Sequence, residues 1–582
     1  MKIAMIGAGI SGIAAARMLQ RFGHEIVMFE RGARPGGVWA VAYPEVRLQN
    51  LAEHYRLAEF PWPFAPELHP TREQLMRYME AAIAHFGLDV RTEHEVRASE
   101  ICEDGWSLEL GTPAGPRRER FDFVVVASGQ YTQAPHRPEL ADRSCFPGQV
   151  LCDREVRDLA VLANKRVAVI GFGKSAVDMA SFAAARGSHV DHVFREPRWL
   201  IPRKILGVLG TRLMFMRAST AMIPAWVHPT PAERLLHTRL RPLVRGFWAL
   251  IGAILRAEAG LHGLWRDPEV RRRMTTLIPR SPVPFEMRSA VAVAPDNYYP
   301  QVIRGQIEPH CGEPVGYTPR GLRLADGREL ACDLVVVSTG SRSPQFPFLP
   351  QEYRDLLEAE PDGVQLYRHV IHPKAPRLAF AGHDHGFLHV PGVEVAMLWL
   401  GAYLRGDLEL PPEPEIERQM AAVQRWKRAN ILFEPARSGA INTRFHQYLE
   451  RHALGPGGVA VPQARGAGRI DRALHGGRLR RDLRGVRALA RGRAAAAAAA
   501  ADVNQARRTC CQCRAVARSQ AQANVHSRPC SSRMAPARGS AWSAAAAATK
   551  DSARAMPATP AAPQIHAHVP PSCRAAPART TQ

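Results

Sequence analysis

Short apolar runs alternate with stretches of helical periodicity along the first 450 residues of this 582-residue chain. Residues 3–6 and 167–170 are apolar runs that each lead into a glycine-rich turn, and a helical pattern follows each turn. A second short strand then follows in both places, at residues 25–29 and 192–194. Strand, turn, helix and strand in this order are typical of a parallel sheet. The pattern therefore predicts an α/β protein with two such units.

The clearest single helix covers residues 71–86. Thr71 and Gln74 have the spacing of a capping box at its start, and Gly87 is a typical helix stop. Apolar residues recur at helical spacing between these two signals. The apolar residues within the segment 333–338 predict a buried strand there, which we assign to the last part of the ordered chain.

These elements predict two Rossmann-like dinucleotide-binding domains, the second inserted in the first. We expect residues 1–155 to begin the first domain, and residues 331–455 to complete it and add C-terminal helices. Residues 156–330 are expected to form the second domain, with a helical insertion at about residues 206–273. Residues 456–582 have low complexity and are expected to form a disordered tail.

Both glycine-rich turns have the spacing of a dinucleotide-binding fingerprint. The first glycine permits a tight turn, the second lets the backbone approach a pyrophosphate, and a small third residue lets helix and strand pack closely. The phosphate then lies against amides at the helix N-terminus. Two fingerprints separated by a domain's length indicate two dinucleotides. The loops consist of Gly7, Ala8, Gly9, Ile10, Ser11 and Gly12, and of Gly171, Phe172, Gly173, Lys174, Ser175 and Ala176.

The residues after the second strand of each unit distinguish the two nucleotides. Glu30 follows the first unit's strand, where a carboxylate accepts hydrogen bonds from a ribose hydroxyl and repels a 2′-phosphate. Arg195 follows the equivalent strand of the second unit, where a guanidinium pairs with a 2′-phosphate. We therefore expect FAD in the first unit and NADPH in the second. The simpler alternative is that both side chains are solvated strand ends.

The formal net charge of +23 is concentrated near the C-terminus. Residues 451–582 contain 22 Lys and Arg against 4 Asp, so the first 450 residues have a nearly balanced charge. Half of the ten cysteines lie in those 450 residues, and none of these forms a Cys-x-x-Cys pair. The apolar run at residues 246–255 is too short to span a bilayer, and the first strand begins at Lys2, which leaves no room for a signal peptide. We therefore expect a cytoplasmic enzyme.

The chain resembles the class B flavin monooxygenases, the group that contains flavin-containing and Baeyer–Villiger monooxygenases. The resemblance covers roughly residues 1–450 in the order of that family. Besides the first fingerprint with Glu30, the matching positions are Gly36-Gly37-Val38-Trp39, Tyr43-Pro44, Leu48-Gln49-Asn50, Phe60-Pro61-Trp62-Pro63, residues 121–129, GFGKSAVD at residues 171–178, residues 195–202, residues 333–340 and residues 378–382.

The resemblance implies an NADPH-dependent enzyme that inserts one atom of O₂ into a small organic substrate through a flavin peroxide. It implies that Asn50 is an active-site side chain beside the flavin and the nicotinamide, although a turn asparagine is a nearly equal alternative. Trp39 is expected to pack beside the flavin. The expected cofactor-binding residues are Gly7, Ala8, Gly9, Ile10, Ser11, Gly12, Glu30, Gly37, Val38, Trp39, Gln49, Asn50, Leu51, Gly171, Gly173, Lys174, Ser175, Ala176, Val177, Asp178 and Arg195.

One fingerprint of the family differs here. Its Phe-x-Gly-x-x-x-His pattern corresponds to residues 146–152, where Cys152 replaces the histidine. Four positions on, Val156 and Arg157 stand where the Baeyer–Villiger branch has a tryptophan and the N- and S-oxygenating branch has an aromatic residue and a lysine. These positions favour N- or S-oxygenation, with Baeyer–Villiger oxidation of ketones as the alternative.

Two functions of other classes remain open. A pyridine nucleotide–disulfide reductase has the same double fold but needs a redox-active cysteine pair near the first helix, and residues 1–70 contain no cysteine. The second is a nucleotide-binding protein that has lost catalysis, which Cys152 keeps open. His383, His385 and His389 suggest a metal site, but no fourth ligand is evident, so we expect none.

The arginine-rich helical pattern at residues 241–260 is expected to be a packed helix, with contact to a membrane surface as the less favoured alternative. Residues 451–582 lack Glu, Phe and Tyr, contain one lysine, and include an alanine run at residues 494–501. Because clustered lysines and stacking aromatic residues are missing, no nucleic-acid partner is expected. This composition is typical of GC-rich DNA translated out of frame, so we expect a frame shift between about residues 455 and 495 and no function beyond it.

Overall fold

The computed structural model describes residues 1–129, 134–205, 209–210, 221–223, 231–286, 292–383 and 389–430. The expected tail at residues 456–582 lies outside the described residues, as do Asp384 and His385. No described helix is long and apolar enough to cross a membrane.

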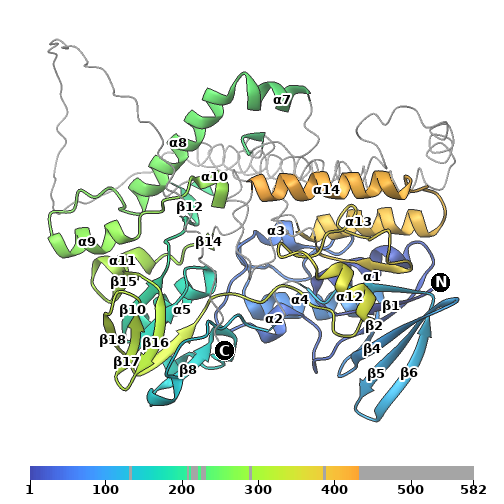
Figure 1. Cartoon of the computed structure of the whole chain (residues 1–582), viewed down its shortest axis with the longest axis horizontal. Coiled ribbons are helices and arrows are strands. Elements are labelled where there is room, and N and C mark those ends of the chain that lie inside the picture. The colour runs from blue at the N-terminus through green and yellow to red at the C-terminus, as the bar shows by residue number, and fades with distance from the viewer. Residues whose placement is uncertain are drawn as a thin grey trace, which may run out of the picture. The chain divides into compact units, whose positions relative to one another are not determined.

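The first unit is built on a five-stranded parallel sheet with the order β20-β7-β1-β2-β3. Figure 1 labels β1 and β2 of this sheet. Its strands are mostly apolar and buried, as expected where both faces of a parallel sheet are covered. The last strand to join comes from far along the chain, which confirms that the first domain is completed after the second unit. The strands are β1 (Lys2–Ile6), β2 (Glu25–Phe29), β3 (Asp89–Arg91), β7 (Phe123–Val126) and β20 (Leu378–Phe380).

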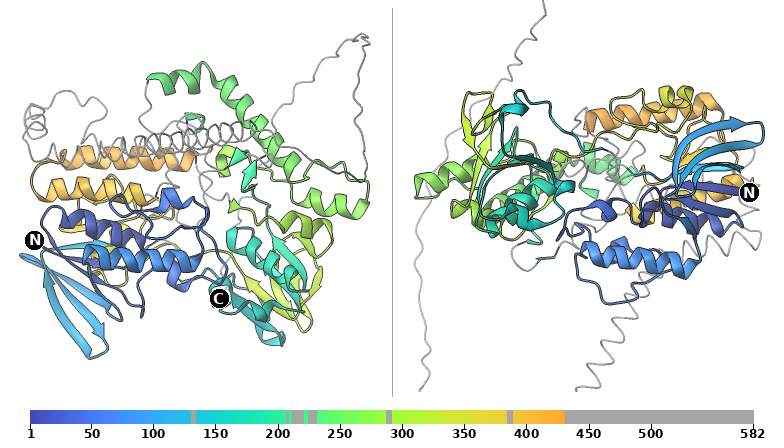
Figure 2. Two further views of the ribbon diagram at one scale, coloured as in Figure 1. Left: turned by 180° about the vertical axis from the view of Figure 1, so that it is seen from behind. Right: turned by 90° about the horizontal axis from the view of Figure 1, so that it is seen from below.

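Alternate residues of β1 face opposite layers of this unit. Ile3 and Met5 pack among helices, whereas Ala4 and Ile6 pack under an antiparallel three-stranded sheet. The ribbons of this unit are seen from two further sides in Figure 2. The helical layer contains α1 (Ile10–Gln20), α4 (Arg72–Phe86) and α13 (His389–Leu404), and the opposite sheet contains β4 (Glu95–Cys102), β5 (Gly105–Thr112) and β6 (Gly115–Phe121). Smaller elements are α2 (Val38–Val41), α3 (Ala52–Tyr55), α12 (Gln351–Leu357) and α14 (Glu413–Asn430).

The capping signals of α4 are confirmed. The Thr71 side chain accepts from the backbone N–H of Gln74, and the Gln74 side chain accepts from the backbone N–H of Thr71. The helix ends at Gly87, whose φ of 60° lies in the left-handed region that glycine adopts readily.

The second unit repeats this plan. Its parallel sheet has the order β15-β10-β9-β19-β8 and again has helices on one face and a three-stranded antiparallel sheet on the other. The parallel strands are β8 (Gln149–Cys152), β9 (Arg166–Ile170), β10 (His189–Phe194), β15 (Ile307–Cys311) and β19 (Leu334–Val337); the antiparallel strands are β16 (Pro314–Thr318), β17 (Gly321–Leu324) and β18 (Glu329–Ala331). The covering helices include α5 (Lys174–Ala185), α9 (Pro268–Thr276) and α11 (Tyr298–Ile303).

The expected domain boundaries at 155/156 and 330/331 are therefore wrong by one strand on each side. β19 pairs with β9 and with β8, so residues 334–337 belong to the second sheet rather than to the return of the first. A continuous run of valines predicts a buried strand but carries no information about which sheet it joins. The return to the first unit comes at β20.

Two longer helices lie in the described part of the expected insertion at residues 206–273: α7 (Pro231–Thr238) and α8 (Arg241–Glu258). One side of α8 packs against Trp199 and Val283, which confirms a packed helix. Leu243 and Leu250 on α8 are 57% and 59% exposed. Short elements complete the unit: η1 (Arg143–Cys145), η2 (Asp153–Glu155), η3 (Leu159–Leu162), α10 (Val283–Glu286), β11 (Leu200–Ile201), β12 (Lys204–Ile205), β13 (Leu209–Gly210) and β14 (Ala292–Val293).

Candidate functional site

The first glycine loop connects β1 to α1 and has no room for side chains at two of its glycines. A Cβ on Gly7 would lie 2.5 Å from the carbonyl oxygen of Ala127, and a Cβ on Gly12 would lie 2.1 Å from the carbonyl oxygen of Gly7. At Gly9 the nearest neighbour is the backbone of Gly37, at 3.4 Å. Gly9 and Gly37 thus bring two stretches of bare backbone together, a surface that fits a pyrophosphate.

Glu30 stands directly after β2, which neighbours β1 in the sheet. Its carboxylate accepts from the backbone N–H of Ala8 at 3.1 Å and from that of Gly32 at 2.9 Å. A carboxylate has about four acceptor positions, so capacity remains for ribose hydroxyls. These two bonds fix the side chain at the edge of the glycine loop.

Other expected residues of the first loop have defined surroundings. Ile10 is buried in the helix-side core. The Ser11 hydroxyl lies 2.7 Å from Nε2 of His389 at the start of α13. A Cβ on Gly382 would meet that hydroxyl at 2.6 Å, so the loop after β20 also approaches α1 closely. Residues from both ends of the first unit thus meet at the N-terminus of α1.

The second glycine loop connects β9 to α5 in the same way. Gly171 has a φ of +122°, and a Cβ there would lie 2.4 Å from the carbonyl oxygen of Ser338. Ala176 is fully buried between helix and strand, as expected for the third position. A Cβ on Gly173 would have no neighbour within 4 Å, so the loop is open above its second glycine, where a phosphate is expected.

A buried histidine that the sequence reasoning missed supports this loop. Nε2 of His192 on β10 lies 2.7 Å from the carbonyl oxygen of Gly171, and Nδ1 lies 2.8 Å from the hydroxyl of Tyr298. Burial lowers the pKa of His192 to about 4, so the ring is neutral near pH 7. Nε2–H therefore donates to Gly171, and Nδ1 accepts from Tyr298. The available signal was a histidine beside the apolar residues Val193 and Phe194 at the end of a predicted strand.

Arg195 directly follows β10, just as Glu30 follows β2, and its side chain is exposed. Arg198, which the sequence places nearby, is instead mostly buried. Its guanidinium lies 3.9 Å from Glu286 and 4.0 Å from Glu196. The buried Glu286 carboxylate accepts from the backbone N–H of Trp199, and burial raises its pKa to about 7. Of these two arginines, Arg195 is the one whose side chain is exposed at the strand end.

The first turn of α5 holds a polar network. Lys174 forms an ion pair with Asp178, with Nζ 2.6 Å from Oδ2, and the hydroxyl of Tyr43 donates to the same carboxylate at 2.7 Å. Val177, expected among the cofactor contacts, is fully buried in the core of the second unit and is placed as a packing residue.

Residues 37–51 carry the remaining expected contacts. Nε1 of Trp39 donates to the hydroxyl of Tyr55 at 2.8 Å. The Gln49 side chain accepts from the backbone N–H of Val293 at 2.9 Å, which ties it to the second unit. Asn50 is 8% exposed. Val38 begins α2, and Leu51 is buried in front of α3.

Comparison with known proteins shows which proteins this chain resembles. Residues 4–205 match the family model for pyridine nucleotide-disulphide oxidoreductases. A probable flavin-containing monooxygenase 1 from Arabidopsis thaliana is 26% identical over 459 residues, which are 71% of this chain and 84% of that protein. A Baeyer-Villiger monooxygenase from Streptomyces coelicolor is 25% identical over 442 residues, 73% of this chain and 82% of that protein. The chain is thus similar, over most of its length, to flavin-containing and Baeyer-Villiger monooxygenases.

A solved structure agrees with this at the level of the fold. The open crystal structure of cyclohexanone monooxygenase has a TM-score of 0.58 and 19% identity, and the match covers 78% of this chain and 97% of that one. The expected α/β architecture with two dinucleotide-binding units is therefore confirmed. The chain is a flavin-dependent monooxygenase.

Cys152, which replaces the family's fingerprint histidine, ends β8 and is fully buried. It packs among Phe146, Ala168 and Val337, and burial raises the pKa of its thiol to about 11. The cysteines in the described part of the chain are all free thiols.

Two other groups of polar residues make contacts within the fold. His383 is buried against Phe346 and Phe380, and burial lowers its pKa to about 4. No described group of three or more His, Cys, Asp or Glu side chains has the geometry of a metal site.

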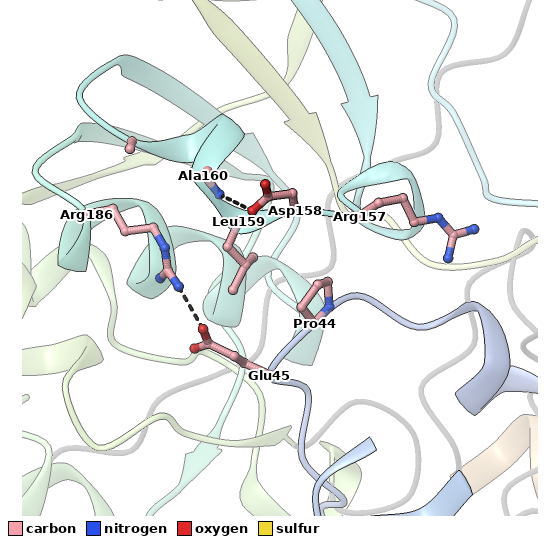
Figure 3. Close-up of a pocket in the computed structure, with 8 residues that line it drawn as sticks. Pro44, Glu45, Arg157, Asp158, Leu159, Ala160 and Arg186 are labelled. Carbon is pink, nitrogen blue, oxygen red and sulfur yellow. Dashed lines mark hydrogen bonds and ion pairs between the residues drawn. The ribbon is translucent and has the colours of Figure 1, made fainter. Parts of the chain in front are cut away.

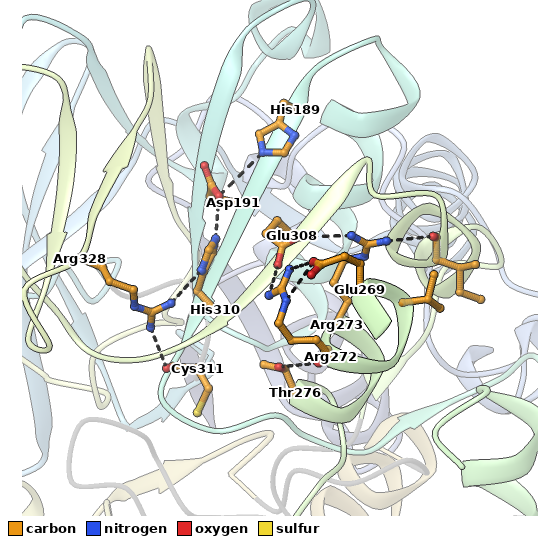
Figure 4. Close-up of polar contacts among 12 residues, drawn as sticks. His189, Asp191, Glu269, Arg272, Arg273, Thr276, Glu308, His310, Cys311 and Arg328 are labelled. Carbon is orange, nitrogen blue, oxygen red and sulfur yellow. Dashed lines mark hydrogen bonds and ion pairs between the residues drawn. The ribbon is translucent and has the colours of Figure 1, made fainter. Parts of the chain in front are cut away.

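The second group lies on the outer strands of the second sheet (Figure 4). His310 on β15 lies 2.7 Å from Asp191 on β10, and Arg272 on α9 pairs with Glu308 on β15 at 2.7 Å. These contacts join the strands to each other and to the helix that covers them.

Proposed function

We propose that the protein is an NADPH-dependent FAD monooxygenase that oxygenates a small amine or sulfide. The main support for this proposal is that both units have a glycine loop, here called a cradle, and that Glu30 and Arg195 stand at equivalent strand ends beside the two loops. The reaction consumes substrate, NADPH, a proton and O₂, and yields oxygenated substrate, NADP⁺ and water. One oxygen atom enters the substrate and the other is reduced to water.

The first cradle is assigned to FAD. The bare backbone at Gly9 and the N-terminus of α1 would lie against the pyrophosphate, and the Glu30 carboxylate would accept hydrogen bonds from the ribose. Bound FAD would accept a hydride from NADPH and, once reduced, activate O₂ for transfer of one oxygen atom.

The second cradle is assigned to NADPH. The open space above Gly173 accommodates its pyrophosphate, and Arg195 pairs with the 2′-phosphate. His192 holds the carbonyl of Gly171, so the turn keeps its shape without the ligand. In this assignment the protein contributes a preformed loop and the exposed guanidinium of Arg195.

Asn50 is assigned to the reacting centre. Its amide can donate a hydrogen bond to oxygen and accept one from a cofactor, and its burial limits competition from water. Trp39, held by Tyr55, is assigned to packing beside the flavin. Neither residue needs to transfer a proton, because the cofactors carry the redox chemistry.

A soft nucleophile is favoured over a ketone as substrate because this chain lacks the tryptophan of the Baeyer–Villiger branch. It has Val156 and the basic residue Arg157 at these positions. The test is to purify the protein, record the absorption spectrum for bound FAD, and follow NADPH oxidation with tertiary amines, sulfides and ketones. Faster NADPH oxidation with an amine or sulfide, together with its oxide as product, supports the proposal. Lactone or ester formation from ketones alone would select the Baeyer–Villiger alternative, and bound FAD without oxygenated product would select a catalytically impaired protein.

A further inference from the structure

Residues 41–46 connect two parts of the proposed flavin site, yet they pack in the other unit. Trp39 precedes this segment and Asn50 follows it in the chain. The side chains of Tyr43 and Val46 are buried in the core formed by α5 and the second sheet. A displacement of α5 relative to the first unit would therefore move this segment, and with it the backbone that leads to Trp39 and Asn50.

Tyr43 makes the central contact of this segment. It is 4% exposed, its hydroxyl donates to Asp178 at 2.7 Å, and its ring packs edge-on against Phe182 with centroids 6.4 Å apart. Asp178 is itself 2% exposed, and it also forms an ion pair with Lys174. Burial, followed by the Asp178 carboxylate, raises the pKa of Tyr43 well above its ordinary value, so the hydroxyl remains a donor.

Two further contacts bind the same segment to the second unit. Glu45 pairs with Arg186 at 2.7 Å, and the Arg157 guanidinium donates to the carbonyl of Val41 at 3.3 Å. Glu45 and Arg186 line a pocket of about 520 Å³ between the segment and the second unit. Figure 3 shows the contact between these two side chains. Glu45 has a φ of 62°, a left-handed conformation that a non-glycine residue adopts only where its surroundings hold it.

Lys174 connects this anchor to the nucleotide loop. It directly follows Gly173, the glycine with open space above it, and its ammonium turns back along the helix to Asp178. A phosphate held at that loop would attract the same ammonium. Lys174 would then be shared between the ligand and Asp178, and the Tyr43 hydrogen bond would change with it.

We propose that Tyr43 is a positioning residue that transmits occupancy of the second nucleotide loop, through Lys174 and Asp178, to Trp39 and Asn50 at the flavin. This inference rests on the proposed function and deepens it by giving the two cofactor sites a physical connection. By linkage, the connection acts in both directions.

The test uses the FAD-loaded protein and 2′-phospho-ADP-ribose, which has the pyrophosphate and 2′-phosphate of NADP⁺ but no nicotinamide to touch the flavin. Binding is measured by calorimetry, and the flavin difference spectrum is recorded at saturation. In the wild type, binding changes the flavin spectrum. In Tyr43→Phe we expect a Kd within about threefold of the wild type and a spectral change reduced at least about twofold.

Lys174→Met breaks the connection at its other end. It should weaken binding at least about fivefold and, at saturating ligand, also lose the spectral change. Tyr78→Phe is the matched control, because it removes a buried tyrosine hydroxyl that hydrogen-bonds the backbone of Leu57 and Phe60 in the first unit. It should keep the wild-type response.

A spectral change of equal size in wild type and Tyr43→Phe would overturn the inference while leaving the proposed function intact. So would tight ligand binding with no spectral change in the wild type. Protein without FAD, or without affinity for the ligand, would overturn the proposed function and this inference together.

Discussion

Glu30 and Arg195 occupy equivalent positions in the two parallel sheets. Each residue directly follows the strand that neighbours the strand leading into a glycine loop. The two units thus share a backbone plan and differ in the sign of the charge at one edge. That difference is the physical basis for assigning FAD to one loop and NADPH to the other.

Replacing Arg195 by alanine is expected to raise the KM for NADPH about tenfold, because one charged contact worth ~1.5–3 kcal/mol is lost. The KM for NADH should stay nearly the same, since NADH has no 2′-phosphate. Steady-state kinetics with both cofactors measure this. An equal rise for NADPH and NADH would remove Arg195 from the 2′-phosphate site.

Gly9→Val is expected to yield protein without yellow colour. A Cβ at Gly9 meets only an ordinary contact with Gly37, so the fold should tolerate it, but the valine methyl groups would occupy the expected pyrophosphate position. Flavin content per protein is read from the absorption spectrum. Gly246→Val on α8, where a Cβ has no neighbour within 4 Å, is the control and should keep its flavin. Normal flavin content in Gly9→Val would mean that the first loop does not hold FAD.

Asn50→Ala is expected to keep FAD but to release more hydrogen peroxide per NADPH consumed, because a hydrogen-bond donor at the reacting centre is lost. The ratio of peroxide formed to NADPH oxidised, with substrate present, is the measurement. Asn297→Ala, at an exposed position of the second unit, should leave this ratio as it is. A ratio equal to that of the wild type in Asn50→Ala would place Asn50 outside the active site.

His192 makes stability depend on pH. Its pKa is near 6.5 in the unfolded chain and about 4 in the folded one, so between these values the unfolded chain binds a proton that the folded protein excludes. The free energy of unfolding should therefore fall as pH drops from about 6.5 to 4, by up to ~1.4 kcal/mol per pH unit from this group. Urea unfolding across that range should show a smaller slope in His192→Gln. An unchanged slope would show that His192 does not exclude its proton.

Deleting residues 456–582 is expected to leave FAD binding and NADPH oxidation at wild-type levels, because the composition of the tail provides no basis for a core. Resequencing the coding DNA tests the frame-shift hypothesis. Peptides from residues 510–582 in native protein, together with an intact reading frame, would contradict it.

The local features of this fold could be predicted from the sequence, whereas several long-range contacts could not. The capping box of α4 and the small residues of both glycine loops depend on residues a few positions apart, and the structure confirms them. β8 and β19 were assigned to the wrong side of a domain boundary, because the apolar pattern of a buried strand is the same in any parallel sheet.

The same limit applies to the site. The Gly171–His192 bond spans 21 residues and the Tyr43–Asp178 bond spans 135, so neither pair shares a motif. Lys174 was expected to face phosphates, and the structure instead pairs it with Asp178, four residues on. Polar residues at buried positions were the signal that could have identified these partners.

Oxygen-isotope labelling tests the central claim most directly. The purified protein is supplied with NADPH, a sulfide or tertiary amine that it oxidises, and ¹⁸O₂, and the product is examined by mass spectrometry. The account predicts one ¹⁸O atom in each product molecule and one NADPH oxidised per product. Product that carries oxygen from water, or NADPH oxidation that yields only hydrogen peroxide with every substrate tried, would contradict it.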